Sequence, residues 1–239
     1  MKNLNIFSLI SEYETAKSGG VLNVPNVSFV DEDSSVRYLL KNVLTHNGYE
    51  YVDLGLPSGL KWATCNVGAI SPEQSGLYFA WGETTGYTSE QVPGIRKFTA
   101  DEYNRGPAAS ISTNLTLEQD AAHVNMGGNW RLPTKDEYQE LIDNCDGVWT
   151  DDYNGTGVAG KVLTSKINGN SVFFPAAGQG YNSNISGRGF NGDYWSASWG
   201  SLASSSSSFL AWFLEFNDWD NQLASTVSYC GHLVRGVFK

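Results

Sequence analysis

Helical periodicity is rare in this chain, and that scarcity constrains the fold more than any other feature. Two short stretches, within residues 116–124 and 134–145, place apolar residues at helical spacing behind a capping motif. After residue 145 the chain consists of Gly-rich turns and short strand-like runs. With 26 Gly and 13% aromatic residues, the composition favours short strands and many turns. We therefore predict two helices and many short strands.

The second of these stretches gives the clearer helix. Thr134 and Glu137 have the spacing of a capping box. The apolar stripe behind them, at i, i+3, i+4 and i+7, comprises Tyr138, Leu141, Ile142 and Cys145. We interpret this stripe as core. Arg131 precedes the helix, and we interpret it as a structural residue that binds a carboxylate or a carbonyl at the helix start.

The first stretch shows the same capping spacing at Thr116 and Gln119. Its apolar positions, at i, i+4 and i+7, are Leu117, Ala121 and Val124. Residues 82–110 show no sustained period and are predicted to form a long surface excursion. The segment 57–59, Pro-Ser-Gly, separates two strand-like runs and predicts a hairpin. Alternation over 211–216 predicts a strand with one buried and one outward face.

The first 48 residues differ from the rest of the chain. They hold short β-like pieces, an acidic turn at 31–33 and none of the tryptophans. Such a segment lacks the apolar bulk for a core of its own. We expect residues 1–48 to be a small β-rich oligomerisation or attachment segment, and residues 49–239 to be one globular domain.

The charge balance limits the partners. The chain has 15 Lys and Arg against 25 Asp and Glu, a net charge of -10, so a phosphate backbone or an anionic membrane is repelled. We predict no nucleic-acid partner and no membrane insertion, because no run approaches the roughly 20 apolar residues that span a bilayer. The apolar run at the N-terminus is too short for a secretory signal, which predicts cytoplasmic synthesis.

The three cysteines, Cys65, Cys145 and Cys230, lack metal-type spacing. We interpret them as buried free thiols rather than as a disulfide between Cys65 and Cys145. The histidines, His46, His123 and His232, have no recognisable nucleophile partner. We therefore expect no catalytic residue, no resident metal and no cofactor. Calcium at residues 217–221, Asn-Asp-Trp-Asp-Asn, is an alternative, although an EF-hand spacing is absent there.

Several segments, taken together and in order, resemble a known family. They are YVDLGLPSGLKWATCNVGA, YFAWGET, GGNWRLPTKDEYQELIDNC, FFPAAG, DYWSAS and GHLVRGV. The chain resembles the major paralogous domain family of Bacteroidetes and Fibrobacter, which is related to the formylglycine-generating-enzyme branch of the C-type lectin fold. This resemblance covers residues 49–239. It implies an α+β domain of C-type lectin type, with two helices and a twisted antiparallel sheet.

The chain is also similar to the variable proteins of diversity-generating retroelements, whose C-terminal stretch is rewritten while the scaffold stays fixed. The ending SYCGHLVRGV keeps Gly231, Val234, Arg235 and Val237 of the usual pattern, with Ser228 and Gly236 as departures. This similarity implies a variable region at about residues 194–235. Relatives of the enzyme branch use reactive cysteines, and only Cys230 lies in the corresponding part here. We therefore predict that the chain is not an enzyme.

In the lectin fold the C-terminal segment crosses one exposed face, so the resemblance implies a single ligand-binding patch. Aromatic side chains bury much area at little entropic cost, and short polar side chains adapt their hydrogen bonds. The expected ligand-binding residues are Trp199, Phe213, Asn217, Asp218, Trp219, Asp220, Asn221, Tyr229 and His232.

These observations lead to one functional hypothesis and one alternative. The first is a non-enzymatic receptor-binding protein, an adhesin at the tail tip of a bacteriophage virion, which binds a protein or glycan of a bacterial surface. Such sites gain avidity when three or more copies are linked, which predicts a homo-oligomer, namely a homotrimer. The alternative is a carbohydrate-binding or adhesive module on the surface of a gut bacterium.

Overall fold

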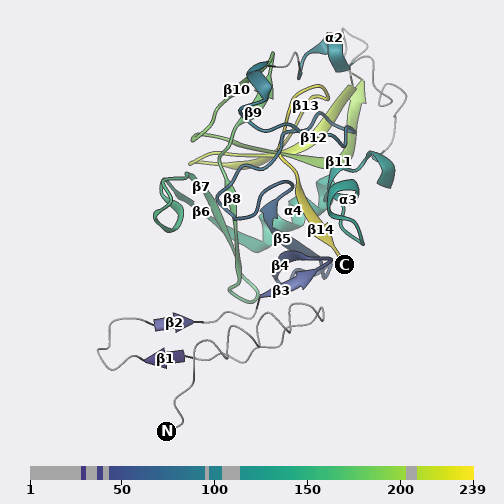
Figure 1. Cartoon of the computed structure of the whole chain (residues 1–239). Coiled ribbons are helices and arrows are strands. Elements are labelled where there is room, and N and C mark those ends of the chain that lie inside the picture. Colours follow the sequence, from purple (N-terminus) through teal and green to yellow (C-terminus); the bar gives the residue numbers. More distant parts are fainter. Residues whose placement is uncertain (1–27, 31–36, 40–42, 95–96, 104–113, 203–208) are drawn as a thin grey trace. The chain divides into compact units, whose positions relative to one another are not determined.

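The computed structural model describes residues 28–30, 37–39, 43–94, 97–103, 114–202 and 209–239 (Figure 1). The chain divides into two units, Met1–Tyr51 and Val52–Lys239. In the first unit, β1 (Ser28–Val30) pairs antiparallel with β2 (Arg37–Leu39), and β3 (Leu44–His46) pairs antiparallel with the start of β4 (Tyr49–Asp53), which ends in the second unit. The acidic turn at 31–33 lies outside the described residues, and the oligomerisation or attachment role of this segment stays a prediction.

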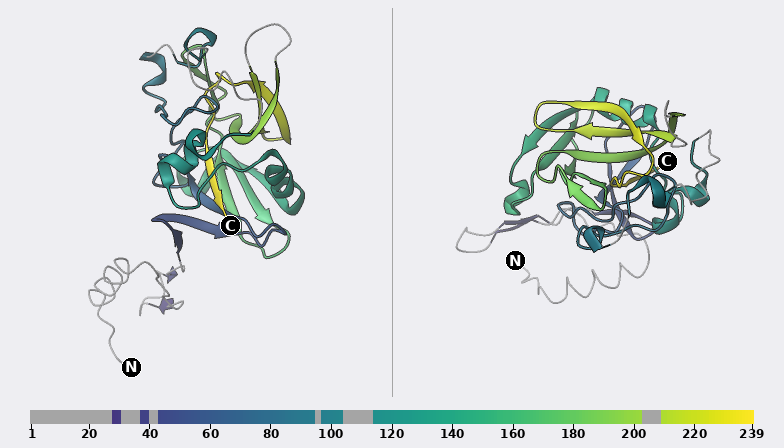
Figure 2. Two further views of the ribbon diagram at one scale, coloured as in Figure 1. Left: turned by 90° about the vertical axis from the view of Figure 1, so that its right-hand side faces the viewer. Right: turned by 90° about the horizontal axis from the view of Figure 1, so that it is seen from above.

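The second unit is built from small, mostly antiparallel sheets. One contains β4, β5 (Lys61–Asn66) and β14 (Arg235–Phe238), and another contains β6 (Cys145–Thr150), β7 (Gly160–Ser165) and β8 (Ser171–Pro175). A third contains β11 (Gly192–Leu202), β12 (Phe209–Phe216) and β13 (Asn221–Val227), which Figure 2 shows side by side. The hairpin β9 (Gln179–Tyr181) and β10 (Asn184–Ser186) completes the set.

The helices are short. They are η1 (Val92–Gly94), α2 (Ala100–Tyr103), η3 (Leu117–Gln119), α3 (Ala121–Met126), α4 (Lys135–Asn144) and η4 (Tyr153–Gly155), where η marks a 3-10 helix. Within the described part of the chain, no helix is long and apolar enough to cross a bilayer. The predicted mixture of antiparallel sheets and short helices is confirmed, and the fold class is α+β.

Helix α4 forms as the sequence predicts. Thr134 Oγ1 accepts a hydrogen bond from Glu137 N, and the Glu137 side chain accepts one from Thr134 N. Tyr138 and Leu141 are fully buried. Arg131 donates two hydrogen bonds to the Glu137 carboxylate, at 2.6 and 2.7 Å, and one to the Leu132 carbonyl. The predicted structural role of Arg131 at the start of this helix is confirmed.

The first helical stretch is divided where the sequence predicted a continuous stripe. The capping box at Thr116 is present, but the helix stops after one turn, and Asp120 begins a new one by accepting a hydrogen bond from His123 N. This break rotates the stripe away from the core. Leu117 and Val124 are exposed as a result. Of the predicted stripe only Ala121 packs inward, and three residues form the buried face of the helix. Those residues are Ala121, Ala122 and Met126.

Strand β12 is covered on both faces, so the prediction of an outward face was wrong. On one face Leu214 and Phe216 are buried, and α4 packs against β11, β12 and β13. On the other face Ala211 and Phe213 are also buried. The terminal ribbon, which we define as residues 228–233, crosses that face and shields it from solvent, as the contacts of His232 show below.

Two smaller expectations also need correction. Segment 82–110 was predicted to lie on the surface, but its residues Val92 and Phe98 are buried in the core. The Phe98 ring packs against Gly180 and Gly231, where a β-carbon would clash with it. Residues 95–96 and 104–110 of that segment lie outside the described residues.

All three cysteines are free thiols, but Cys65 is half-buried rather than buried. The hairpin at 57–59 forms, with Gly59 N bonded to Leu56 O.

Arg235 locks the C-terminal strand into the centre of the second unit. Its guanidinium is fully buried and donates to Asn66 Oδ1 and to the carbonyls of Ala63, Thr64 and Phe173, at 2.6 to 2.9 Å. It also lies 4.5 Å from the centroid of the Phe174 ring. No described carboxylate lies within 4.0 Å of it. Backbone carbonyls of β5 and β8 therefore take the place of a counter-ion.

Replacing Arg235 should be among the most costly single changes in this protein. Arg235→Lys keeps the charge but loses the planar fork, which leaves buried carbonyls without donors, so we expect a loss of about 3–5 kcal/mol in the free energy of unfolding. Urea denaturation measures this loss. Lys166→Ala, which removes an exposed 3.7 Å ion pair with Asp146, is the control and should change stability by less than about 0.5 kcal/mol. Equal effects would contradict the locking role.

Candidate functional site

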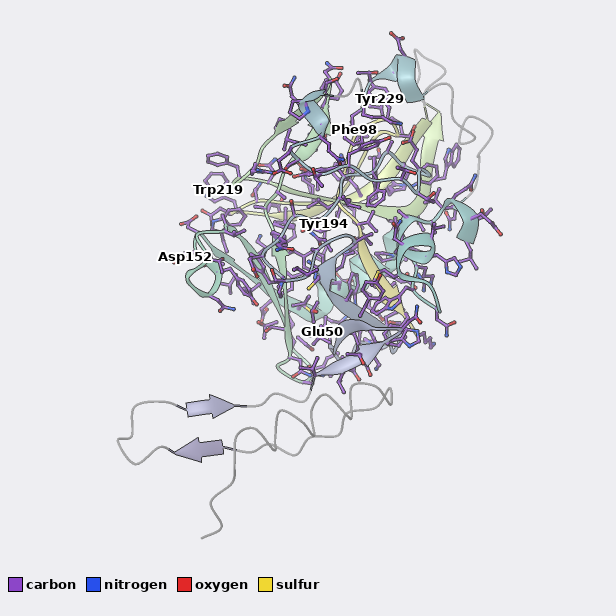
Figure 3. The ribbon with its side chains drawn as sticks, viewed as in Figure 1. Glu50, Phe98, Asp152, Tyr194, Trp219 and Tyr229 are labelled. Atoms are coloured by element: carbon purple, nitrogen blue, oxygen red, sulfur yellow. The ribbon has the colours of Figure 1, made fainter. Side chains whose placement is uncertain are left out.

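The predicted ligand-binding residues do not form one patch. Asn217, Asp218, Trp219 and Asp220 make the turn between β12 and β13, and Asn221 begins β13. Trp199 pairs with Ala211 at the other end of β12, and Tyr229 follows the far end of β13. A strand of seven residues is about 20 Å long, so these groups lie at opposite ends of the hairpin. Figure 3 shows Trp219 and Tyr229 well apart.

Phe213 and His232 belong to the core, which corrects the prediction that they contact ligand. The His232 ring is fully buried, with its centroid 4.0 Å from that of Trp195 and 4.5 Å from that of Phe213. Its Nε2 donates to Gln179 Oε1 over 3.2 Å. Phe213 is 7% exposed. The terminal ribbon folds back over the sheet, and this tertiary contact removes both rings from solvent.

The turn between β12 and β13 is held rigid by its own polar side chains. Asn217 Oδ1 accepts hydrogen bonds from the backbone N–H groups of Trp219 and Asp220, both at 2.9 Å. Asp220 Oδ1 accepts from Asn221 N at 2.8 Å. Asn and Asp commonly stabilise tight turns in this way. Asn217, Asp220 and Asn221 were predicted to contact ligand, and these bonds give them a structural role.

Lys161 of β7 anchors this turn from beneath. Its ammonium donates to Asp220 O at 3.1 Å and to Asn221 Oδ1 at 2.7 Å. The side chain is nearly fully buried, and burial lowers the pKa of its ammonium, opposed by the charges of Asp220 and Asp218. Gly147 of β6 leaves the space for this contact, because a β-carbon there would lie 3.0 Å from Asn221 Nδ2.

Trp219 projects from the anchored turn into solvent. It is 89% exposed, and every other tryptophan among the described residues is buried or half-buried. Phe190 is 74% exposed and precedes Gly192, which pairs with Phe216 at the same end of the sheet. Large exposed aromatics are unusual on a soluble domain and mark candidate interaction sites. Asp218 is exposed beside Trp219, as expected.

The opposite end of the hairpin carries a second, smaller aromatic group. Tyr181 and Tyr229 stack with ring centroids 6.1 Å apart and planes inclined by 27°. Burial and the neighbouring Tyr181 raise the pKa of Tyr229 to about 12. Trp199 is half-buried. Tyr229 therefore has an accessible edge, as the sequence predicted, but shares it with Tyr181 rather than with Trp219.

Sequence reasoning missed Asp193, a buried carboxyl under the terminal ribbon. It lies opposite Glu215 on β12, and its Oδ2 has no hydrogen-bond partner. Burial, with a smaller contribution from the Glu215 charge, raises the pKa of Asp193 to about 7. His232 shows the converse behaviour, since burial lowers its pKa to about 3. In the sequence, the position of a single Asp directly before the aromatic pair Tyr194–Trp195 of β11 could have indicated a buried carboxyl.

The chemistry of nucleophiles and metal ligands is limited in this region. Burial raises the pKa of Cys230 to about 11, so its thiol is neutral at physiological pH. Among the described residues, no group of three or more His, Cys, Asp and Glu is placed to hold a metal ion. The oxygens considered for calcium accept hydrogen bonds instead, from backbone N–H groups and from the Lys161 ammonium. The arrangement thus presents an aromatic side chain on a fixed turn.

Removing the Lys161 ammonium should loosen the turn without unfolding the protein. Lys161→Met keeps the packed stem, and water can satisfy the acceptors left by the ammonium because Asp220 is exposed and Asn221 is only half-buried. We expect amide hydrogen exchange at residues 219–221 to accelerate at least tenfold while the melting temperature changes little. Lys166→Met, at an exposed position after β7, is the matched control. Unchanged exchange at the turn would show that Lys161 does not anchor it.

Asp193 and His232 should give opposite pH dependences that cancel. The raised pKa of Asp193 stabilises the fold at low pH, and this stability is lost as pH rises from 3.8 toward about 7. The lowered pKa of His232 stabilises above pH 6.5, and this is lost as pH falls toward about 3. Each slope approaches about 1.4 kcal/mol per pH unit. Between pH 5 and 6.5 their contributions therefore offset each other.

Single variants should expose each slope in urea denaturation between pH 5 and 6.5. Asp193→Asn removes the carboxyl, so the free energy of unfolding should fall as the solution is acidified. His232→Gln removes the imidazole, so the same quantity should fall as pH rises. Because the second variant also loses ring packing, the sign of its slope rather than its absolute stability is the readout. Parallel pH profiles for both variants and wild type would contradict the assignment.

Comparison with known proteins identified no similar protein. No family model matches the chain, and no curated protein or solved structure matches it. The motif resemblance described from the sequence therefore stays a hypothesis about family, and the function has to be inferred from the residues and contacts above.

Proposed function

We propose that this protein is a non-enzymatic ligand-binding protein that contacts its target through the turn between β12 and β13. The observation that carries the proposal is Trp219, 89% exposed on a turn fixed by Asn217 and Lys161. A side chain held in its binding conformation loses little entropy on association. Tryptophan is also enriched among the residues that dominate binding energy. An anchored, exposed tryptophan fits this role.

We further propose a C-type lectin-like framework with a diversified surface, as the motif resemblance implies. Burial limits where diversification is tolerated, since large-to-small changes in a core cost about 2–5 kcal/mol. Within 194–235, the buried positions include Tyr194, Trp195 and the terminal ribbon apart from Tyr229. The variable positions in this proposal are the accessible ones. Among the described residues they are Ser198 through Ser201, Leu210, Trp212, Glu215, Asn217 through Val227, and Tyr229.

The proposed setting is the tail tip of a bacteriophage, with a bacterial surface molecule as the target. In this proposal, copies of the chain are joined through the N-terminal unit, so that several weak sites act together. The acidic net charge of -10 accords with a target other than nucleic acid. The raised pKa of Cys230 accords with a binding role rather than thiol catalysis.

Two aromatic variants test the proposal because the structure places them differently. Trp219→Ala should weaken binding to purified bacterial envelopes at least tenfold and leave the melting temperature unchanged, because the ring is exposed. Phe213→Ala should lower the free energy of unfolding by about 3–5 kcal/mol, because it opens a cavity in the core. Biolayer interferometry and thermal denaturation give the two readouts.

Leu117→Ala is the matched control for binding, since Leu117 is an exposed apolar residue on η3, outside the β12–β13 turn. It should bind envelopes as wild type does. If Trp219→Ala also binds as wild type does, or if wild type binds none of a panel of envelopes, the proposed function is wrong.

A further inference from the structure

A cavity of about 570 Å³ opens on the second unit, and none of the predicted ligand-binding residues lines it. This volume lies within the range of about 300–1,000 Å³ that is usual for small-molecule sites. Six separate stretches line it, which makes it a product of the tertiary fold. They are Gly68, 73–77, 88–90, 157–159, 175–177 and 188–189.

The cavity wall is rigid because it is tied to the core. Asn66 donates to Ser75 O at 2.9 Å and also accepts from the buried Arg235. Gly76 has φ of +70°, and a β-carbon there would lie 2.4 Å from Val67 O. On the opposite side, Gly189 N donates to Ala176 O at 2.7 Å. The cavity is therefore a preformed feature rather than a gap between loose loops.

Polar side chains of both kinds surround the cavity. Glu73 and Glu90 provide carboxylate acceptors, and Ser89 Oγ donates to Glu90 Oε1. Arg188 provides donors, and no described carboxylate lies within 4.0 Å of its guanidinium. Gln74 uses its Oε1 to accept from Ile70 N, so its amide NH2 group remains able to donate. A ligand rich in groups that both donate and accept suits this lining.

Two walls of the cavity continue along the chain into segments that contact or flank the turn that carries Trp219. The wall formed by 157–159 leads directly into β7, where Lys161 binds Asp220 and Asn221 of that turn. Gly189 leads to the exposed Phe190 and then to Gly192, which pairs with Phe216. Figure 3 shows Asp152, from the loop before β7, on the same side of the molecule as Trp219. Short stretches of chain therefore connect the cavity wall to both exposed aromatic side chains.

We propose that the ligand is a neutral oligosaccharide, which would occupy the cavity and extend past Phe190 to Trp219; this inference rests on the proposed binding function. Sugar hydroxyls both donate and accept, which matches the carboxylates, the guanidinium and the amide. The C–H faces of sugar rings pack against flat aromatic side chains. Glu73, Glu90 and the net charge of -10 disfavour an anionic ligand. The charged groups of Glu73, Glu90 and Arg188 at the cavity disfavour a purely apolar one.

The test uses purified bacterial envelopes that bind the wild-type chain. One portion is oxidised with periodate, which cleaves the vicinal diols of sugars, and a second is digested with protease. We expect periodate to reduce binding at least tenfold and protease to leave it intact. Neutral oligosaccharides released from the same envelopes by mild acid should compete with the binding.

Cavity variants complete the test. Glu90→Gln and Arg188→Gln should each weaken envelope binding at least tenfold at unchanged melting temperature. Glu118→Gln is the matched control, because Glu118 is equally exposed and hydrogen-bonded to a neighbouring Thr but does not line the cavity. It should bind as wild type does.

The outcomes separate this inference from the proposed function. Binding that depends on Trp219 but survives periodate and disappears with protease overturns the saccharide ligand and leaves the binding function standing. Wild-type binding by Glu90→Gln and Arg188→Gln overturns the role of the cavity. Binding to no envelope overturns the proposed function itself, and this inference with it.

Discussion

A single buried guanidinium organises the second unit. Arg235 has no carboxylate within 4.0 Å among the described residues, and it stabilises its charge with three backbone carbonyls, one amide oxygen and an aromatic face. A buried charge is tolerated when its hydrogen bonds are complete. Because the acceptors come from β5 and β8, one side chain fixes the last strand against two sheets. Packing of the terminal ribbon against β11 depends on that strand.

Two sets of hydrogen bonds connect this framework to the candidate binding surface. One passes from Arg235 through Asn66 to the cavity wall at Ser75. The other runs along β7, where the Lys161 ammonium holds the turn that carries Trp219. Exposed groups on fixed supports associate with less loss of entropy than groups on mobile loops. In the proposed diversification, substitutions at the accessible rim would leave the contacts of the locked core intact.

Local patterns in the sequence predicted the elements whose stability is local. The capping box at Thr134, the Arg131–Glu137 pair and the apolar stripe all lie within residues 131–145 and are present, although Ile142 of the stripe is half-buried rather than buried. The prediction of one continuous helix over 116–124 was wrong because Asp120 ends the first turn and caps a new helix. Short-range periodicity does not reveal such a break, since the side chain that causes it is polar and compatible with either arrangement.

The sequence by itself determined the α+β class, the short elements, the acidic character and an exposed Trp219. The tertiary structure decided which of the other C-terminal residues are accessible. Phe213 and His232 are buried because the terminal ribbon returns over β11 and β12, and Asn217 and Asn221 are engaged in holding the turn. The cavity is lined by stretches that lie more than a hundred residues apart in the sequence. Burial depends on such long-range packing, which no local pattern encodes.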